Sequence, residues 1–135
     1  MGYGYKFHDE NRILTPLKAG AESHWETVLA EVAQKIQSAQ GKIAVFVSPQ
    51  LSNEEIFLIQ ELFKNKLKVT SLYLVKAKAD GVEDDFLMKA DKNPNSKGAE
   101  LIGFKYNEAD LAEFSKLSDS GQLTGAVIFG QDLPV

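Results

Sequence analysis

The segment with the clearest potential for chemistry is the turn at residues 48–53, which joins an apolar run to the start of a helix. Backbone N–H groups at a helix N-terminus, together with the helix dipole, favour an anion such as a phosphate. This turn contains no glycine, and the chain has no GxxxxGK[ST] sequence and no GxGxxG after the apolar run. A pyrophosphate therefore approaches the backbone less easily, and a capped turn without a ligand is the alternative interpretation.

A second group of polar residues could hold a metal ion or act as general acids and bases. Asp84, Asp85 and Asp91 are close in sequence, but Lys89 and Lys92 are interleaved with them, as in a solvated surface loop. The chain has no cysteine, and its two histidines, His8 and His24, are far apart. Since no GxSxG sequence occurs either, we predict neither a catalytic residue nor a metal site.

The elements that position the turn follow from the sequence around it. Residues 43–47 form a continuous apolar run of β-branched and aromatic side chains, IAVFV, which is typical of a strand covered on both faces. Ser52 has the position of a helix N-cap, and Glu55 follows at the spacing of a capping box. The apolar face of this helix consists of Ile56, Ile59, Leu62 and Phe63. The segment therefore predicts a strand, a tight turn and a helix.

Further apolar patterns predict the remainder of the fold. Residues 67–75 have the composition of a second strand, and residues 126–129 have that of a third, buried strand, which ends at Gly130. Ser23, Ser96 and Asn107 are predicted N-caps of three further helices, the first with an apolar stripe from Trp25 to Ile36. We predict an α/β fold: a three-layer, Rossmann-like open sheet, mostly parallel, with strand order 2-1-3 and helices on both faces. Its switch point would lie at residues 48–53 and 130–133.

Length and composition limit the possible classes of protein. A chain of 135 residues with 44% hydrophobic residues favours one domain, and we predict an irregular arm at residues 1–22 and a single α/β domain at 23–135, cut from a longer protein. A net charge of −4 with scattered basic residues disfavours nucleic-acid binding. No apolar run is long enough for a membrane span or a signal sequence, so we expect neither membrane insertion nor secretion.

Several stretches resemble a known family. Residues 44–64, AVFVSPQLSNEEIFLIQELFK, look like the strand, turn and helix of molybdopterin oxidoreductases, and more specifically of the large iron–sulfur subunit of bacterial NADH-quinone oxidoreductase, which is respiratory complex I. Residues 84–103, DDFLMKADKNPNSKGAELIG, are the more specific match. Residues 12–36 and 125–135 are similar to two other segments of that subunit. The resemblance covers most of the chain from Arg12 onward.

The resemblance implies a scaffold domain of an oxidoreductase subunit that supports electron transfer without a redox centre of its own and is not catalytic by itself. In the parent family, the iron–sulfur clusters lie in cysteine-rich N-terminal domains, and many members have lost a working molybdopterin site. Because this chain has no cysteine, the resemblance implies no cofactor within it. The implied partners are other subunits of an NADH-quinone oxidoreductase-like complex, which is cytoplasmic and peripheral to the inner membrane. A cofactor-facing edge would lie at residues 48–53, at 91–98 and at Gly130. The candidate binding residues are Ser48, Pro49, Gln50, Ser52, Asn53 and Gly130.

Two other functions stay open on the sequence alone. The first is a small-ligand module that binds a pterin or a nucleotide at the turn of residues 48–53. The second is an interaction domain similar to response regulators, although the end of the first predicted strand carries Val47, Ser48 and Pro49 instead of an acidic cluster.

Overall fold

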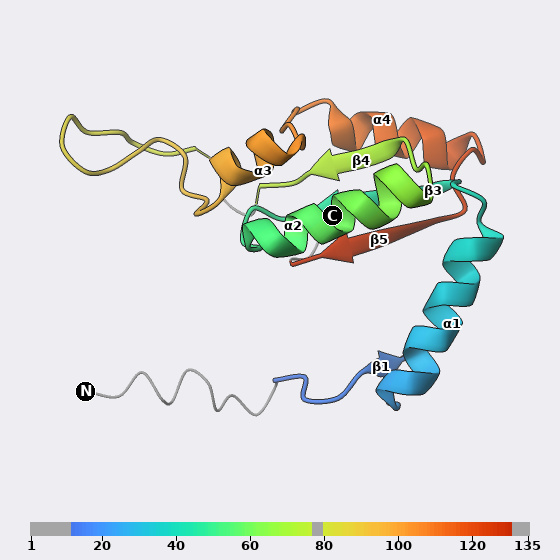
Figure 1. Cartoon of the computed structure of the whole chain (residues 1–135). Helices are drawn as coiled ribbons and strands as arrows, with labels where there is room; N and C mark the ends of the chain where they lie inside the picture. The colour runs from blue at the N-terminus through green and yellow to red at the C-terminus, as the bar shows by residue number, and fades with distance from the viewer. Residues whose placement is uncertain (1–11, 77–79, 131–135) are drawn as a thin grey trace. The chain divides into compact units, whose positions relative to one another are not determined.

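The computed structural model describes residues 12–76 and 80–130 and divides the chain into two compact units, Met1–Ser38 and Ala39–Val135 (Figure 1). The first unit contains a short antiparallel hairpin of β1 (Leu17–Lys18) and β2 (Ala21–Glu22), followed by helix α1 (Trp25–Ser38). The two residues of the hairpin turn, Ala19 and Gly20, both have positive φ. Such a turn matches the twist of the two strands. This hairpin falls within residues 1–22, where an irregular arm is predicted.

Helix α1 forms where the sequence predicts it, but its apolar stripe is not part of a core. None of its residues is buried, and Trp25 and Leu29 are more than half exposed. Lys18 of the hairpin forms an ion pair with Glu31 of the helix at 2.6 Å, and Lys35 lies 3.3 Å from the same carboxylate. Hydrogen bonds from these two lysines lower the pKa of Glu31. Periodicity therefore predicts the helix correctly, but it does not predict what the helix packs against.

The second unit is organised around a three-stranded parallel sheet with the order β4-β3-β5. Strand β3 (Ile43–Val47) is central and buried at every position, as its continuous apolar run predicts. Strand β4 (Ser71–Leu74) pairs along one side of it and β5 (Gly125–Phe129) along the other. The prediction that β5 is a buried strand is wrong: most of its residues are exposed, because it is an edge strand of the described sheet.

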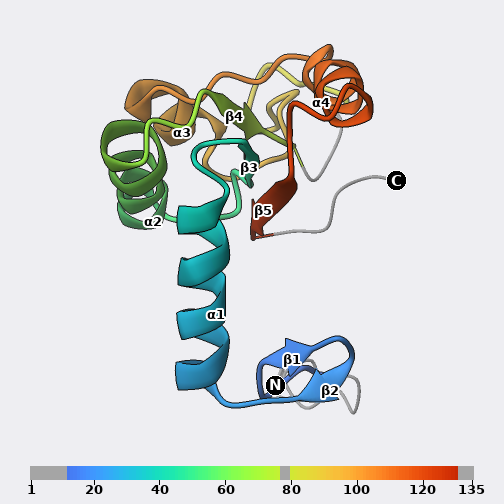
Figure 2. The ribbon, with the colours of Figure 1, turned by 90° about the vertical axis from the view of Figure 1, so that its right-hand side faces the viewer.

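Contacts between aromatic side chains, on both faces of the sheet, hold the helices of this unit against it. Phe46 contacts Tyr73 and also Phe114 of α4 (Asp110–Asp119), with ring centroids 5.2 and 5.0 Å apart. On the other face, Phe63 packs edge-on against Phe129 of β5 at 5.8 Å. Phe63 belongs to η2 (Gln60–Lys66), a π-helical segment that continues α2 (Asn53–Ile59). Figure 2 shows α2 and α4 on opposite sides of the sheet.

The predicted fold class is wrong. The described residues form a small α/β fold with a two-stranded antiparallel sheet and a separate three-stranded parallel sheet, whose order β4-β3-β5 is not a clear 2-1-3 Rossmann fold. The physical reason is the small size of the parallel sheet, together with the separate unit that contains α1. A three-layer Rossmann-like fold would need a sheet with more paired strands and with helices packed on both of its faces.

The helix caps agree only in part with the sequence. Ser52 is the N-cap of α2 and forms the predicted capping box with Glu55. Ser96, however, is the first residue of α3 (Ser96–Ile102), whose N-cap is Asn95. Asn107 is also a predicted cap, but α4 begins after Ala109. The Asn107 side chain instead accepts a hydrogen bond from the backbone N–H of Ala109 at 3.0 Å and so stabilises the turn before the helix.

Candidate functional site

The predicted binding turn lies at the carboxyl end of the central strand, where its own polar groups are already paired. Ser48 is fully buried, and its backbone N–H donates to the carbonyl of Phe129 at 3.0 Å. The Ser48 hydroxyl accepts from the backbone N–H of Gln50 at 3.1 Å, and the Leu51 N–H donates to the Ser48 carbonyl at 3.2 Å. These bonds close the turn and hold it against β5.

The capping box takes up donors that an anion would need. Ser52 donates its backbone N–H to the Glu55 carboxylate at 2.8 Å, and Glu55 donates its own N–H to the Ser52 hydroxyl at 3.3 Å. Both donors belong to the set of N–H groups that a helix N-terminus offers to a phosphate. In addition, Glu55 places a negative charge at this end of α2. The start of α2 is therefore a less favourable anion site than its position in the fold suggests.

The loop at residues 91–98 folds directly onto the turn. The backbone N–H of Asn95 donates to the carbonyl of Pro49 at 3.0 Å. The Asn95 side-chain Nδ2 donates to the Leu51 carbonyl at 2.8 Å and to Asn53 Oδ1 at 3.0 Å. One asparagine thus joins two segments more than forty residues apart in the sequence. We call this set of contacts, made by Asn95 with Pro49, Leu51 and Asn53, the Asn95 joint.

Two glycines allow the close approach of the segments at this edge. A Cβ atom built on Gly98 would overlap the Oδ1 atoms of both Asn53 and Asn95. Gly130 has φ of +86°, and a Cβ there would lie 3.0 Å from Leu51 and 3.1 Å from Ser48. Both positions therefore favour glycine, because a Cβ on Gly98 would displace two asparagine side chains and a Cβ on Gly130 would be tightly packed at a positive φ.

An ionic network extends the joint toward β4. Asp91 accepts hydrogen bonds from the backbone N–H and the side-chain amide of Asn93 at 2.8 and 2.9 Å, and it lies 3.4 Å from the Lys76 ammonium. Burial raises the pKa of Asp91, but neighbouring Ser96, the bonds from Asn93 and the Lys76 charge outweigh it and hold the pKa far below its ordinary value. The Ser96 hydroxyl is buried near this carboxylate without a hydrogen bond of good geometry.

Lys76 is itself held from several sides. It forms an ion pair with Asp80 at 2.9 Å, and its ammonium lies 5.1 Å from the centre of the Tyr106 ring. The hydrogen bond to Asp80 raises the pKa of Lys76 against the opposing effect of burial, and the charge of Asp91 adds to the increase. The network formed by Lys76 and Asp91 thus stabilises the chain internally and offers little free charge to a ligand.

All six predicted binding residues lie at or beside one edge of the parallel sheet, near the loop at residues 91–98. The turn contacts the loop through Asn95 and lies close to Gly130 through Leu51 and Ser48. The sequence did not reveal Asn95 as the bridging residue, because Asn93, Pro94 and Asn95 together indicate only a turn. It also missed Lys76, which carries no motif. What the structure brings together is a packed junction between chain segments.

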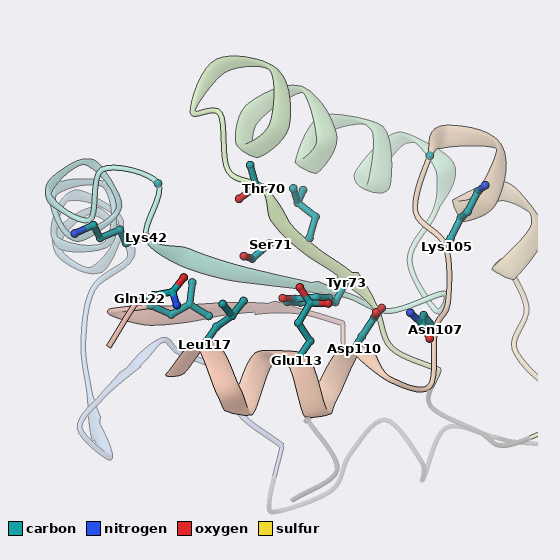
Figure 3. A pocket seen from close by; sticks show the side chains of 14 residues that line it. Lys42, Thr70, Ser71, Tyr73, Lys105, Asn107, Asp110, Glu113, Leu117 and Gln122 are labelled. Atoms are coloured by element: carbon teal, nitrogen blue, oxygen red, sulfur yellow. The ribbon is translucent and has the colours of Figure 1, made fainter. Parts of the chain in front are cut away.

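A groove opens at the other side of the sheet, between β4 and α4, and reaches the amino ends of β3 and β4 (Figure 3). Its volume is about 710 Å³. None of the predicted binding residues contributes to it. It is lined by Gly41, Lys42, Thr70, Ser71, Leu72, Tyr73, Gly103, Lys105, Asn107, Asp110, Glu113, Leu117, Gln122 and Leu123.

Two absences apply to the residues that the structure describes. Over residues 12–76 and 80–130, no group of three or more histidine or acidic side chains is placed to hold a metal ion. Within the same ranges, no helix has the length and apolar character that crossing a bilayer requires.

Comparison of the chain with protein-family models, with curated proteins and with solved structures found no match. The resemblance to the large iron–sulfur subunit of NADH-quinone oxidoreductase therefore depends on the sequence stretches alone.

Proposed function

We propose that this chain is a scaffold domain of a protein similar to the large iron–sulfur subunit of NADH-quinone oxidoreductase, within the molybdopterin oxidoreductase superfamily. It supports electron transfer by holding other subunits or domains in place and has no redox centre of its own. One observation carries the proposal. The Asn95 side chain donates hydrogen bonds to Leu51 and Asn53, and it therefore occupies the edge where a ligand would bind. The two stretches that carry the resemblance thus bind each other.

The loop at residues 80–90 supports the part of the proposal that concerns partners. It projects from the unit beyond α3 (Figure 1, yellow). Asp84 Oδ1 accepts the backbone N–H groups of Phe86, Leu87 and Met88 at 3.0, 2.7 and 2.7 Å, and these bonds lower the pKa of Asp84. The Phe86 and Leu87 side chains are 93% and 79% exposed. A loop that fixes its own backbone while it exposes apolar side chains is suited to docking on a partner.

In this proposal the partners are other subunits of an NADH-quinone oxidoreductase-like complex. The protein is cytoplasmic and reaches the inner membrane only through that complex. Iron–sulfur clusters and quinone chemistry belong to other parts of the complex, and molybdopterin to relatives that keep a complete site. Asp85 lies beside the loop tip and favours a partner surface with an apolar pocket and a basic group at its rim, whereas Glu83 is paired with Lys89 at 3.0 Å.

The proposal is tested by isolating the native protein, with an affinity tag, from its own cells in a mild detergent. Mass spectrometry should identify iron–sulfur subunits of an NADH-quinone oxidoreductase in the purified complex. The double variant Phe86→Asp, Leu87→Asp should reduce their recovery at least about tenfold, as expected when an apolar anchor of an interface is lost. Leu101→Asp is the matched control, since Leu101 is 81% exposed on α3.

Two results would contradict the scaffold. The first is a wild-type protein that is purified without any such subunit. The second is a double variant that keeps the subunits as well as Leu101→Asp does, since the loop tip would then contribute nothing to association.

A small-ligand module remains the second candidate. It is favoured by the place of residues 48–53 and Gly130 at the carboxyl ends of parallel strands, where ligands of open α/β sheets bind. A pterin or a nucleotide at that edge would have to compete with Asn95 for Leu51 and Asn53.

A further inference from the structure

The groove between β4 and α4 has a polarity that the Asn95 joint does not explain. Asp110 and Glu113 are three residues apart on α4, and both carboxylates point from the helix toward β4 and Tyr73 (Figure 3). Lys42 and Lys105 also line the groove, but their ammonium groups extend away from it (Figure 3). The lining contains as many lysines as acidic residues, but only the carboxylates face inward. The interior of the groove is therefore acidic.

Tyr73 adds a second, independent feature. Its side chain is only 5% exposed, and its hydroxyl makes no hydrogen bond of good geometry among the described residues, although the Ser71 hydroxyl lies nearby. The ring packs against Phe46 in a core cluster that Leu111 and Phe114 of α4 cover. A buried hydroxyl without a partner is unfavourable, and such a group commonly marks a place where a missing ligand or water belongs.

The electrostatic surroundings agree with this geometry. Burial raises the pKa of Tyr73, the nearby Ser71 hydroxyl opposes the increase, and the charges of Glu113 and Asp110 add to it. The pKa of Asp110 is raised by burial and then by the charge of Glu113. Each of these groups would be relieved by a positive charge placed between them.

We propose that this groove binds the ammonium group of an organic amine, with Glu113, Asp110 and the Tyr73 hydroxyl as its acceptors. A primary ammonium has three N–H donors and no acceptor, which matches two carboxylates and one hydroxyl. A divalent metal ion fits less well, because a neutral tyrosine hydroxyl is a poor ligand for it and, of the described residues, only Asp110 and Glu113 bring carboxylates to the groove. The proposal does not depend on the scaffold function.

The ammonium group can come from a free amine or from a lysine side chain of another protein, and the test separates the two sources. The uniformly ¹⁵N-labelled chain is titrated with 1,4-diaminobutane, with a short lysine-containing peptide and with tetramethylammonium, which has no N–H donor. We expect saturable amide shifts at residues 70–73 and 110–113 for the first two probes and none for the third. The tighter of the first two probes identifies the source.

Two variants and one control assign the acceptors. Glu113→Gln and Tyr73→Phe each preserve the shape of the side chain and should weaken binding at least about fivefold. Glu54→Gln, an exposed residue of α2, should leave it unchanged. Equal binding of tetramethylammonium, no saturable shift with either amine, or unchanged affinity in both variants would overturn the proposal. The spectra of the variants also report whether each remains folded.

Discussion

Replacing Phe46 with alanine should lower the free energy of unfolding by about 3–5 kcal/mol. Phe46 is 1% exposed at the centre of the parallel sheet and contacts both Tyr73 of β4 and Phe114 of α4. Its removal leaves a cavity between strand and helix that the edge strands cannot fill, because the backbone of β3 is fixed by pairing on both sides. Urea denaturation followed by circular dichroism measures the change.

Phe86→Ala is the control for this prediction. It removes the same side chain at a position that is 93% exposed, so the free energy of unfolding should change by less than about 0.5 kcal/mol. A loss below about 1 kcal/mol for Phe46→Ala would refute its place in the core.

Gly98→Ala should destabilise the chain by about 1–3 kcal/mol, although alanine is the better helix former. Gly98 lies within α3, and an added Cβ would overlap the side-chain oxygens of Asn53 and Asn95. The methyl group must therefore push apart the two residues of the Asn95 joint. Thermal or chemical denaturation gives the sign of the effect.

Gly125→Ala is the matched substitution for Gly98→Ala. A Cβ on Gly125, in edge strand β5, meets no atom within 4 Å, so alanine there should be neutral or stabilise by up to about 1 kcal/mol. If Gly98→Ala were stabilising as well, the loop at residues 91–98 would not press against the turn, and the Asn95 joint would be wrong.

Short-range patterns predicted the local structure well. The five apolar residues of β3 and the spacing of Ser52 and Glu55 both specify their conformation within a few residues, and both have the predicted form. The same rule failed for Ser96 and Asn107, because serine and asparagine form several competing turns whose choice depends on distant contacts. Asn95 takes the cap position while its side chain is engaged with Leu51 and Asn53.

Long-range arrangement was harder to predict. The stripe of α1 predicts a packed helix, but periodicity cannot name the surface that it meets, and no residue of α1 is buried. The apolar sequence of β5 predicts a buried strand, but an edge strand with one neighbour exposes the same side chains. Both errors concern how many other elements of the chain a helix or strand packs against. The sequence of that element alone does not encode this number.

The candidate sites also show that local structure was predictable from the sequence and long-range contacts were not. The sequence placed the turn at residues 48–53 beside Gly130, because both follow apolar runs of a parallel sheet. It could not predict that Asn95 would close the turn. The groove could not be predicted either, since Tyr73 and Glu113 are forty residues apart and neither belongs to a motif.

The contacts of Asn95 make the turn at residues 48–53 and the loop at residues 91–98 a structural joint within the chain, and ligand titration tests this claim most directly. The ¹⁵N-labelled chain is mixed with a pterin and, separately, with a guanine nucleotide, each to millimolar concentration. The amide signals of Ser48, Gln50, Asn53 and Gly130 report on the joint. We predict no saturable shift of these signals with either ligand. A saturable shift confined to these residues would contradict the joint and favour a ligand-binding module.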